Sequence, residues 1–230
     1  MSSKVNITII IPTLNESQVL GRLLERVLTR ENHNIEIIVV DGGSDDNTLE
    51  LAKNFGVKVI TCECSRAKQM NEGAKIAAHD VLYFVHADTM PPIEFYEDGK
   101  AYLEKGYDAV CYKSEFENGP FMLRLNQFFS QFYWLVSRGG DQSLFIRKNV
   151  FEALGRYDEE MVVMEEYPII EKLMKTKQLA VINKPILICT RKYDGRSWLR
   201  VSRANYAAFK LYQKGAASEV IKARYSELLG

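Results

Sequence analysis

Short β-branched runs and longer amphipathic stretches alternate along residues 1–90 of the chain. The short runs are followed by proline, acidic residues or histidine and predict buried strands over residues 5–11, 35–40, 57–62 and 81–85. The stretches between them repeat apolar residues every three or four positions and predict helices over residues 15–28, 47–54 and 67–78. Strands and helices in alternation are typical of a parallel sheet built from βαβ units.

The pattern is less regular after residue 90. It predicts helices over residues 93–105, 121–136, 149–154, 167–175, 198–213 and 218–228, and strands over residues 107–112, 143–147, 180–182 and 186–189. No internal repeat or linker-like segment interrupts it. We therefore predict one α/β domain over residues 1–230 with a mainly parallel, mixed sheet flanked by helices. Residues 1–90 would form its nucleotide-binding half, and residues 91–230 an acceptor-side half that ends in helices.

The predicted helix over residues 121–136 is unusually aromatic. One helical stripe holds Phe121, Leu125, Phe128, Phe129, Phe132 and Val136, a pattern that most often faces a core. Met122, Tyr133 and Trp134 extend the apolar surface beyond this stripe. The surplus could form an acceptor groove, a homodimer contact or a membrane-facing surface. Arg124 is the only charged residue in the segment, so the polybasic support of membrane attachment is missing, and we favour core or homodimer contact.

Composition narrows the possible classes of protein. The 230 residues are 47% hydrophobic, and 30 Lys and Arg balance 30 Asp and Glu. This balance gives no overall field that would attract nucleic acid. No stretch reaches the roughly 18 apolar residues of a transmembrane helix, and no secretion signal opens the chain. We expect four reduced cysteines, no structural zinc at Cys62 and Cys64, and a cytoplasmic protein.

Polar and acidic groups follow three of the predicted strands. Residues 12–16 (PTLNE) follow the first, residues 41–44 (DGGS) the second and residues 86–88 (HAD) the fourth. In open parallel sheets ligands bind beyond the carboxyl ends of the strands, so these groups would share one rim. Either Asp41 or Asp88 alone could simply begin a turn. Neither a dinucleotide glycine fingerprint nor a phosphate-binding P-loop is present, which leaves carboxylates that hold a divalent cation against a diphosphate.

These segments resemble glycosyltransferase family 2, whose members have the GT-A fold. The resemblance rests on residues 9–16 (IIIPTLNE), 37–48 (IIVVDGGSDDNT), 65–74 (SRAKQMNEGA), 86–89 (HADT), 140–147 (GDQSLFIR) and 191–193 (RKY). The last four are similar to a subgroup of small soluble members associated with arsenosugar, radical-SAM and selenium gene neighbourhoods. The order and spacing of these motifs carry the resemblance.

The resemblance implies a nucleoside-diphosphate sugar donor. It places the donor on Pro12, Thr13, Asn15, Glu16, Asp41, Gly43, Arg66, Lys68, Ala87 and Asp88, with Asp41 on the base or ribose. Glu16 could instead be a carboxylate that favours a helix start. Arg66 and Lys68 could face solvent, although cations at a helix start oppose the helix dipole and so favour a ligand role.

The resemblance also implies a divalent cation, Mn²⁺ or Mg²⁺. Asp88 takes the last position of the family's Asp-x-Asp metal motif, while His86 replaces the first aspartate. The cation would then rest mainly on Asp88 and the diphosphate oxygens. His86 is either a second ligand or a hydrogen-bonded histidine at the end of a strand.

The catalytic base of the family is usually the aspartate of a Glu-Asp pair that opens a helix. The matching pair here is Glu165-Glu166, so Glu166 takes the base position. Nearby competitors are Asp158, Glu159 and Glu160, and the whole group could be a solvated acidic loop. Asp141 would lie near the donor sugar and the acceptor, or else form a turn between glycines and a strand.

The predicted activity is therefore an inverting, metal-assisted glycosyl transfer by single displacement. A UDP-sugar is the favoured donor and a GDP-sugar the second choice, and the acceptor would be a small molecule or a lipid. One alternative is a sugar-1-phosphate nucleotidyltransferase, although the glycine-rich basic loop of those enzymes is missing. The other is a non-catalytic nucleotide-sugar-binding protein, which the substitutions at His86 and Glu166 keep open.

Overall fold

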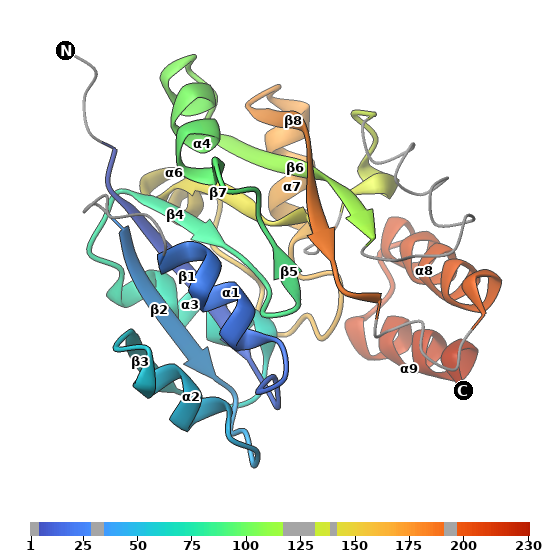
Figure 1. The fold of residues 1–230 in the computed structure, drawn as a ribbon. Coiled ribbons are helices and arrows are strands. Elements are labelled where there is room, and N and C mark those ends of the chain that lie inside the picture. The colour runs from blue at the N-terminus through green and yellow to red at the C-terminus, as the bar shows by residue number, and fades with distance from the viewer. Residues whose placement is uncertain (1–4, 29–34, 117–131, 139–141, 191–196) are drawn as a thin grey trace.

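The computed structural model describes residues 5–28, 35–116, 132–138, 142–190 and 197–230. Its centre is one sheet with helices on both sides (Figure 1). The strands are β1 (Ile7–Thr13), β2 (Ile35–Asp41), β3 (Lys58–Thr61), β4 (Val81–Phe84), β5 (Thr89–Met90), β6 (Ala109–Phe116), β7 (Leu144–Arg147) and β8 (Leu179–Ile188). Across the sheet they lie in the order β3-β2-β1-β4-β7-β6-β8-β5.

The sheet is mixed but mainly parallel. β1 pairs in parallel with β2 and β4, β2 with β3, and β6 with β8. The antiparallel pairs are β4 with β7, β6 with β7, and β5 with β8. β1 has neighbours on both edges and is buried along its whole length, which explains its continuous run of apolar residues. The structure confirms the predicted single α/β domain.

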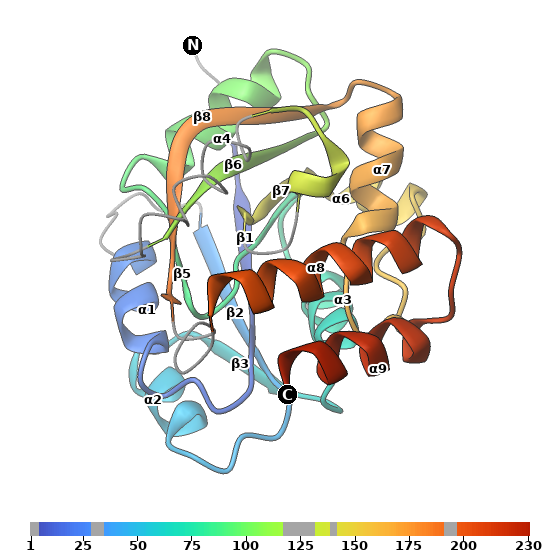
Figure 2. The same ribbon diagram turned by 90° about the vertical axis from the view of Figure 1, so that its right-hand side faces the viewer.

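Helices cover both faces of the sheet. Over one face lie α1 (Leu20–Leu28), α2 (Thr48–Asn54) and α4 (Phe95–Glu104), which bury Leu23, Ala52 and Phe95 in one core. Over the other lie α3 (Arg66–Ile76), α6 (Lys148–Ala153) and α7 (Tyr167–Lys175), with Met70, Phe151 and Ile169 in a second core. At the end of the chain α8 (Trp198–Gln213) and α9 (Ser218–Leu229) pack side by side (Figure 2).

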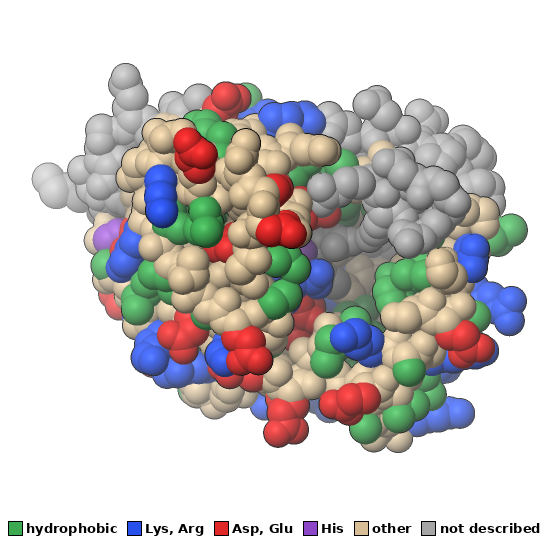
Figure 3. Space-filling model, turned by 90° about the horizontal axis from the view of Figure 1, so that it is seen from below, with side chains coloured by type: hydrophobic (Ala, Val, Ile, Leu, Met, Phe, Trp, Pro, Cys, Tyr) green, Lys and Arg blue, Asp and Glu red, His purple; other side chains and the backbone are tan. Residues whose placement is uncertain are grey.

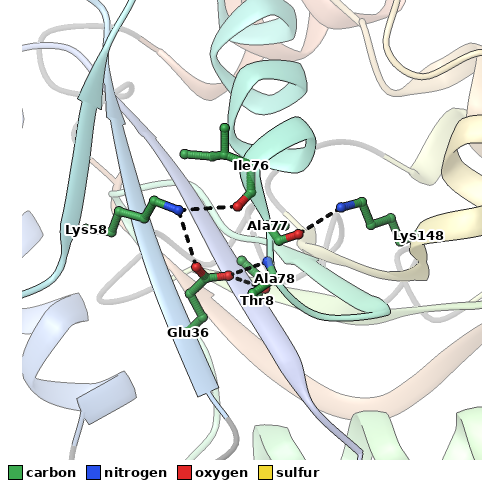
Figure 4. Close-up of polar contacts among 7 residues, drawn as sticks. All are labelled: Thr8, Glu36, Lys58, Ile76, Ala77, Ala78 and Lys148. Carbon is green, nitrogen blue, oxygen red and sulfur yellow. Dashed lines mark hydrogen bonds and ion pairs between the residues drawn. The ribbon is translucent and has the colours of Figure 1, made fainter.

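A polar cluster fixes the end of α3 that is remote from the predicted rim (Figure 4). Lys148 Nζ donates to the carbonyl of Ala77 at 2.8 Å, and Lys58 Nζ donates to the carbonyl of Ile76 at 3.3 Å. Glu36 accepts from the backbone N–H of Ala78 at 2.8 Å. Lysines at a helix C-terminus satisfy carbonyls that have no partner within the helix.

Close packing fixes the middle of the same helix. A side chain at Gly73 would begin 2.5 Å from Ile10 Cγ2 and 3.1 Å from Val40 Cγ2. Glycine therefore lets α3 lie directly against β1 and β2. Its first residue, Arg66, is thereby placed at the carboxyl end of these two strands.

Two predicted strands and one predicted helix have other bounds in the structure. Residues 180–182 and 186–188 belong to the single strand β8, which ends before Cys189. An irregular register opposite Tyr112 and Lys113 absorbs residues 183–185 between them. The predicted helix 15–28 begins only at Leu20, since Asn15 has a φ of 56° and cannot continue a right-handed helix.

The predicted aromatic helix lies largely outside the described residues. The prediction of an α-helix is wrong at the end that the structure describes, where η1 (Leu135–Ser137) is a single 3₁₀ turn. Ser137 Oγ bonds to the carbonyl of Trp134 at 2.8 Å, a local contact that competes with helix formation. Trp134 and Val136 are exposed, so this end is not core. None of the helices in the described ranges has both the length and the apolar composition that a bilayer span requires.

Candidate active site

The loops that follow β1 and β2 are joined by hydrogen bonds. The backbone N–H of Asn15 donates to Ser44 Oγ at 2.8 Å, and Asn15 Oδ1 accepts from the N–H of Asp45 at 3.0 Å. The left-handed conformation of Asn15, which asparagine tolerates better than most residues, makes both contacts possible. Glu16 donates its backbone N–H to Thr48 Oγ1 at 2.8 Å. The predicted donor segments after β1 and β2 therefore form one connected rim.

Asp41 is fully buried and organises this rim. One carboxylate oxygen accepts the backbone N–H groups of Gly43 at 2.9 Å and Ser44 at 2.8 Å. The other accepts from the hydroxyls of Thr13, at 3.1 Å, and Ser44. Asp41 thus has a structural function in the loop in addition to the predicted contact with a nucleoside.

Gln69 on α3 completes the connection. Its Nε2 donates to the carbonyls of Thr13 and Val40, each at 2.8 Å. Gln69 is buried and ties the ends of β1 and β2 to the helix that carries Arg66. The family resemblance gave Gln69 no role, and its position in the SRAKQMNEGA motif was the only signal in the sequence.

The two predicted phosphate-binding cations have different partners. Lys68 Nζ lies 2.7 Å from Glu63 Oε2 at the surface. Arg66 Nη1 lies 3.2 Å from Glu165 Oε1, which connects the start of α3 to the start of α7. The Arg66 side chain is 54% exposed and the Glu165 side chain 1%, so the ion pair lies at the mouth of a buried site.

The segment after β4 sends its two polar side chains to different surroundings. His86 is buried, and its Nε2 lies 3.4 Å from Glu166 Oε1. Asp88 is half-buried; Thr89 Oγ1 donates to its Oδ1 at 3.4 Å, and its backbone carbonyl accepts from the N–H of Cys189 at 3.0 Å. His86 is therefore directed at the predicted base, and Asp88 keeps an accessible carboxylate.

Glu165 and Glu166 immediately precede α7, in which Pro168 lies in the first turn. Met164 before them has a φ of 65°, an uncommon conformation for a residue with a side chain. Both glutamates are buried, Glu165 to 1% exposure and Glu166 to 5%. Asp158, Glu159 and Glu160, the competing acids, are exposed.

The two carboxyl groups ionise differently. Burial and the charge of Glu166 raise the pKa of Glu165 to about 7, although Arg66 opposes this shift. Burial also disfavours the charge on Glu166, but its contact with His86 and the field of Arg66 outweigh burial and lower the pKa of Glu166. A buried carboxylate that stays ionised at neutral pH is suited to accept a proton.

This site lies at a hollowed face of the molecule. Figure 3 shows that face from below, the side toward which the arrowhead of β2 points in Figure 1. The hollow lies between the surface of the N-terminal half and that of the C-terminal helices, with acidic and basic side chains beside it.

The structure unites only part of the predicted site. It brings together His86, Arg66, Glu165 and Glu166, and it joins the rim of Asn15 and Asp41 through hydrogen bonds. Gly43 is exposed on that rim, whereas Pro12 and Ala87 are buried behind it. Asp141 and residues 191–193 lie outside the described residues. Within the described ranges, no three His, Cys, Asp or Glu side chains gather into a metal-binding group.

Comparison with known proteins places the chain in a family. Residues 8–154, more than half of the chain, match the sequence model of glycosyl transferase family 2. Poly-beta-1,6-N-acetyl-D-glucosamine synthase of Staphylococcus epidermidis is 34% identical over 90 residues, which are 36% of this chain and 22% of that protein. A PGL/p-HBAD biosynthesis glycosyltransferase of Mycobacterium bovis is 27% identical over 173 residues, 70% of this chain and 66% of that protein. The match thus spans about a fifth of the first relative and about two thirds of the second.

Solved structures show the same fold. TarS of S. aureus in complex with UDP has a TM-score of 0.68 at 17% identity, over 98% of this chain and 71% of that one. The mannosyltransferase PcManGT of Pyrobaculum calidifontis, in complex with GDP-Man and Mn²⁺, has a TM-score of 0.67 at 15% identity, over 99% and 70%. At such identities the likeness establishes the fold alone, which is the predicted GT-A fold. Together with the sequence match, it shows that the chain belongs to glycosyl transferase family 2.

Proposed function

We propose that the protein transfers a sugar from a nucleoside-diphosphate donor to an acceptor hydroxyl, with inversion at the anomeric carbon. The observation that carries this proposal is the contact between Glu166 and His86, 3.4 Å apart and both buried. It places an ionised carboxylate beside the strand end that bears Asp88. A base next to a potential diphosphate site is what a single displacement requires.

The donor would occupy the rim formed by the loops after β1 and β2. Asn15, Glu16 and Gly43 are accessible there, and Asp41 lies beneath them with its carboxylate at the turn. Arg66 at the start of α3 supplies positive charge for a diphosphate. The structural neighbours bound to UDP and to GDP-Man support a nucleotide of either base, and the family resemblance favours UDP.

A divalent cation fits this site at Asp88. Asp88 is half-buried, and hard oxygen ligands such as its carboxylate suit Mn²⁺ and Mg²⁺. His86 is turned toward Glu166, so we assign the cation to Asp88 and the donor's own phosphate oxygens, with His86 outside its ligand set. When bound, the cation would stabilise the negative charge that collects on the departing diphosphate.

Glu166 would remove the proton of the acceptor hydroxyl as its oxygen attacks the sugar. The contact with His86 and the field of Arg66 keep Glu166 ionised despite its burial. Arg66 and Glu165 would hold the turn before α7 against α3, so that the base keeps its place relative to the donor. Asp141 stays a predicted contact to the sugar or acceptor.

Release of nucleotide tests this function. The protein should liberate UDP or GDP from a matching nucleotide sugar, slowly to water and faster with an acceptor, in the presence of Mn²⁺. A full screen of UDP- and GDP-sugars that yields neither release nor binding would refute the proposal. Binding without release would instead support the nucleotide-sugar-binding alternative.

We also infer membership of the subgroup that carries the HADT and GDQ motifs. Its support is the imidazole of His86, which has a distinct partner in Glu166 and does not merely replace a metal-binding aspartate. A small-molecule or lipid hydroxyl is the expected acceptor, and a screen of acceptors with the matching donor tests this inference.

A further inference from the structure

A small cavity lies behind the proposed base, between β4, α3 and α7. Its polar lining consists of His86, Ser143, Tyr157 and Glu166, and the rest is apolar. The space accommodates about one water molecule, far less than a sugar or a nucleotide. A site of this size with several polar groups around it is suited to a single buried water.

Tyr157 lines this cavity, and its neighbours hold it in place. Its ring packs against Phe84 and Phe151, with centroids 5.1 Å and 5.0 Å away. Its backbone is clamped by Asn71, which accepts from the N–H of Tyr157 at 3.1 Å and donates to its carbonyl at 2.9 Å. Backbone and ring are therefore both fixed, and the position of the hydroxyl follows.

The Tyr157 hydroxyl is buried and has no hydrogen-bond partner among the described residues. Burial raises the pKa of Tyr157 well above its ordinary value, so the hydroxyl keeps its proton and remains a donor. A buried hydroxyl without a partner loses the hydrogen bonds that it makes in water, and native structures seldom tolerate that loss.

A complementary acceptor lines the same cavity. Glu166 Oε1 is buried, and within the described part of the chain it makes no hydrogen bond of acceptable geometry. His86 Nε2 lies 3.4 Å away but is not aligned for a hydrogen bond. Ser143 Oγ is already engaged elsewhere, because it donates at 3.1 Å to the hydroxyl of Tyr83 in the core on the other face of the sheet.

We propose that this cavity binds one ordered water molecule that accepts from Tyr157 Oη and donates to Glu166 Oε1. The water gives the two buried groups the partners that they lack and ties the base to a rigid part of the core. Tyr157 is then a positioning residue that acts through the water on Glu166. The catalytic consequence rests on the proposed function, whereas the water site itself does not.

A crystal structure that shows ordered water tests the site directly. We expect one water with oxygens of Tyr157 and Glu166 both about 2.6–3.2 Å away. A dry cavity would overturn the proposal. This test needs neither donor nor acceptor, so its failure can be distinguished from failure of the proposed transferase activity.

Tyr157→Phe gives an independent thermal test. If the water is present, the substitution removes a satisfied hydrogen bond, and Tm should fall by about 2–4 °C. If the hydroxyl is truly without a partner, its removal should raise Tm, which would contradict the proposal. Tyr112→Phe is the matched control for the loss of a satisfied hydrogen bond, because the buried Tyr112 hydroxyl bonds to Asp98 at 3.3 Å. Tyr206→Phe, at an exposed position, should leave Tm unchanged.

The positioning role has its own readout. Tyr157→Phe should lower kcat for transfer about tenfold, with little change in KM for the donor, because the base is misplaced while the donor site is intact. An unchanged kcat in the folded variant would refute the positioning role.

Discussion

His86 Nε2 lies 3.4 Å from Glu166 Oε1, which joins the two positions at which this chain departs from the pattern of its family. Histidine stands where the resemblance places the first acid of a metal motif, and glutamate stands where it places an aspartate base. Each substitution alone suggests a weakened enzyme. Their contact suggests a matched pair, because the longer glutamate reaches the imidazole and the imidazole keeps the buried carboxylate ionised.

The assignment of the cation to Asp88 leads to a prediction about nucleotide binding. UDP or GDP should raise the Tm of the wild-type protein more with Mn²⁺ than with a chelator, because ligands that bind only the native state stabilise it. Asp88→Ala should abolish this metal-dependent increment and leave the Tm of the free protein nearly unchanged, since Asp88 is only half-buried. An increment of wild-type size in Asp88→Ala, measured by thermal shift, would exclude Asp88 as the ligand.

Asp41 requires a pair of variants, because it organises the loop that it is predicted to serve. Asp41→Ala removes the acceptor of the Gly43 and Ser44 N–H groups. The free energy of unfolding should therefore fall by roughly 1–3 kcal/mol, and Tm should fall with it. Asp41→Asn retains one carbonyl oxygen for these N–H groups but loses the acceptor of the Thr13 and Ser44 hydroxyls, so it should lower Tm less than Asp41→Ala does. If Asp41 also contacts the nucleoside, Asp41→Asn should weaken UDP binding about tenfold or more in calorimetry. Unchanged affinity would limit Asp41 to its structural function.

Much of the sheet could be predicted from local pattern alone. β1, β2 and β4 are largely buried on both faces and therefore read as runs rich in Ile, Val and other apolar residues. α8 was predicted with its observed bounds. In contrast, β5 has two residues and exists only because it pairs with β8, a long-range relationship that no local pattern records.

The site could be predicted only in part for the same reason. The positions of His86 and Glu166 followed from the resemblance, but their contact depends on how α7 packs against the sheet. Tyr157 was not predicted at all, because an isolated tyrosine in a loop looks like any other aromatic core residue. Its significance emerges only from the ring packing and the shared cavity.

Glu165 should make stability depend on pH. Its pKa in the folded protein is about 7, against an ordinary value of 4.5. Between these pH values the folded state retains a proton that the unfolded state has released, so the free energy of unfolding falls as pH rises. The side chain of Glu165→Gln cannot ionise, so this variant should lose less stability than the wild type as pH rises. Its free energy of unfolding relative to that of the wild type should be higher at pH 8 than at pH 5 by an amount on the order of 1–3 kcal/mol. A difference between variant and wild type that does not change with pH would contradict this ionisation.

The central claim is that Glu166 is the base, and the most direct test is the transfer rate of Glu166→Gln at saturating donor and Mn²⁺. The amide preserves shape but cannot take a proton, so we predict a loss of about a hundredfold or more with donor affinity nearly unchanged. Glu160→Gln, at an exposed acid near the site, should transfer at the wild-type rate. A Glu166→Gln variant that transfers sugar at a near-normal rate would contradict the account.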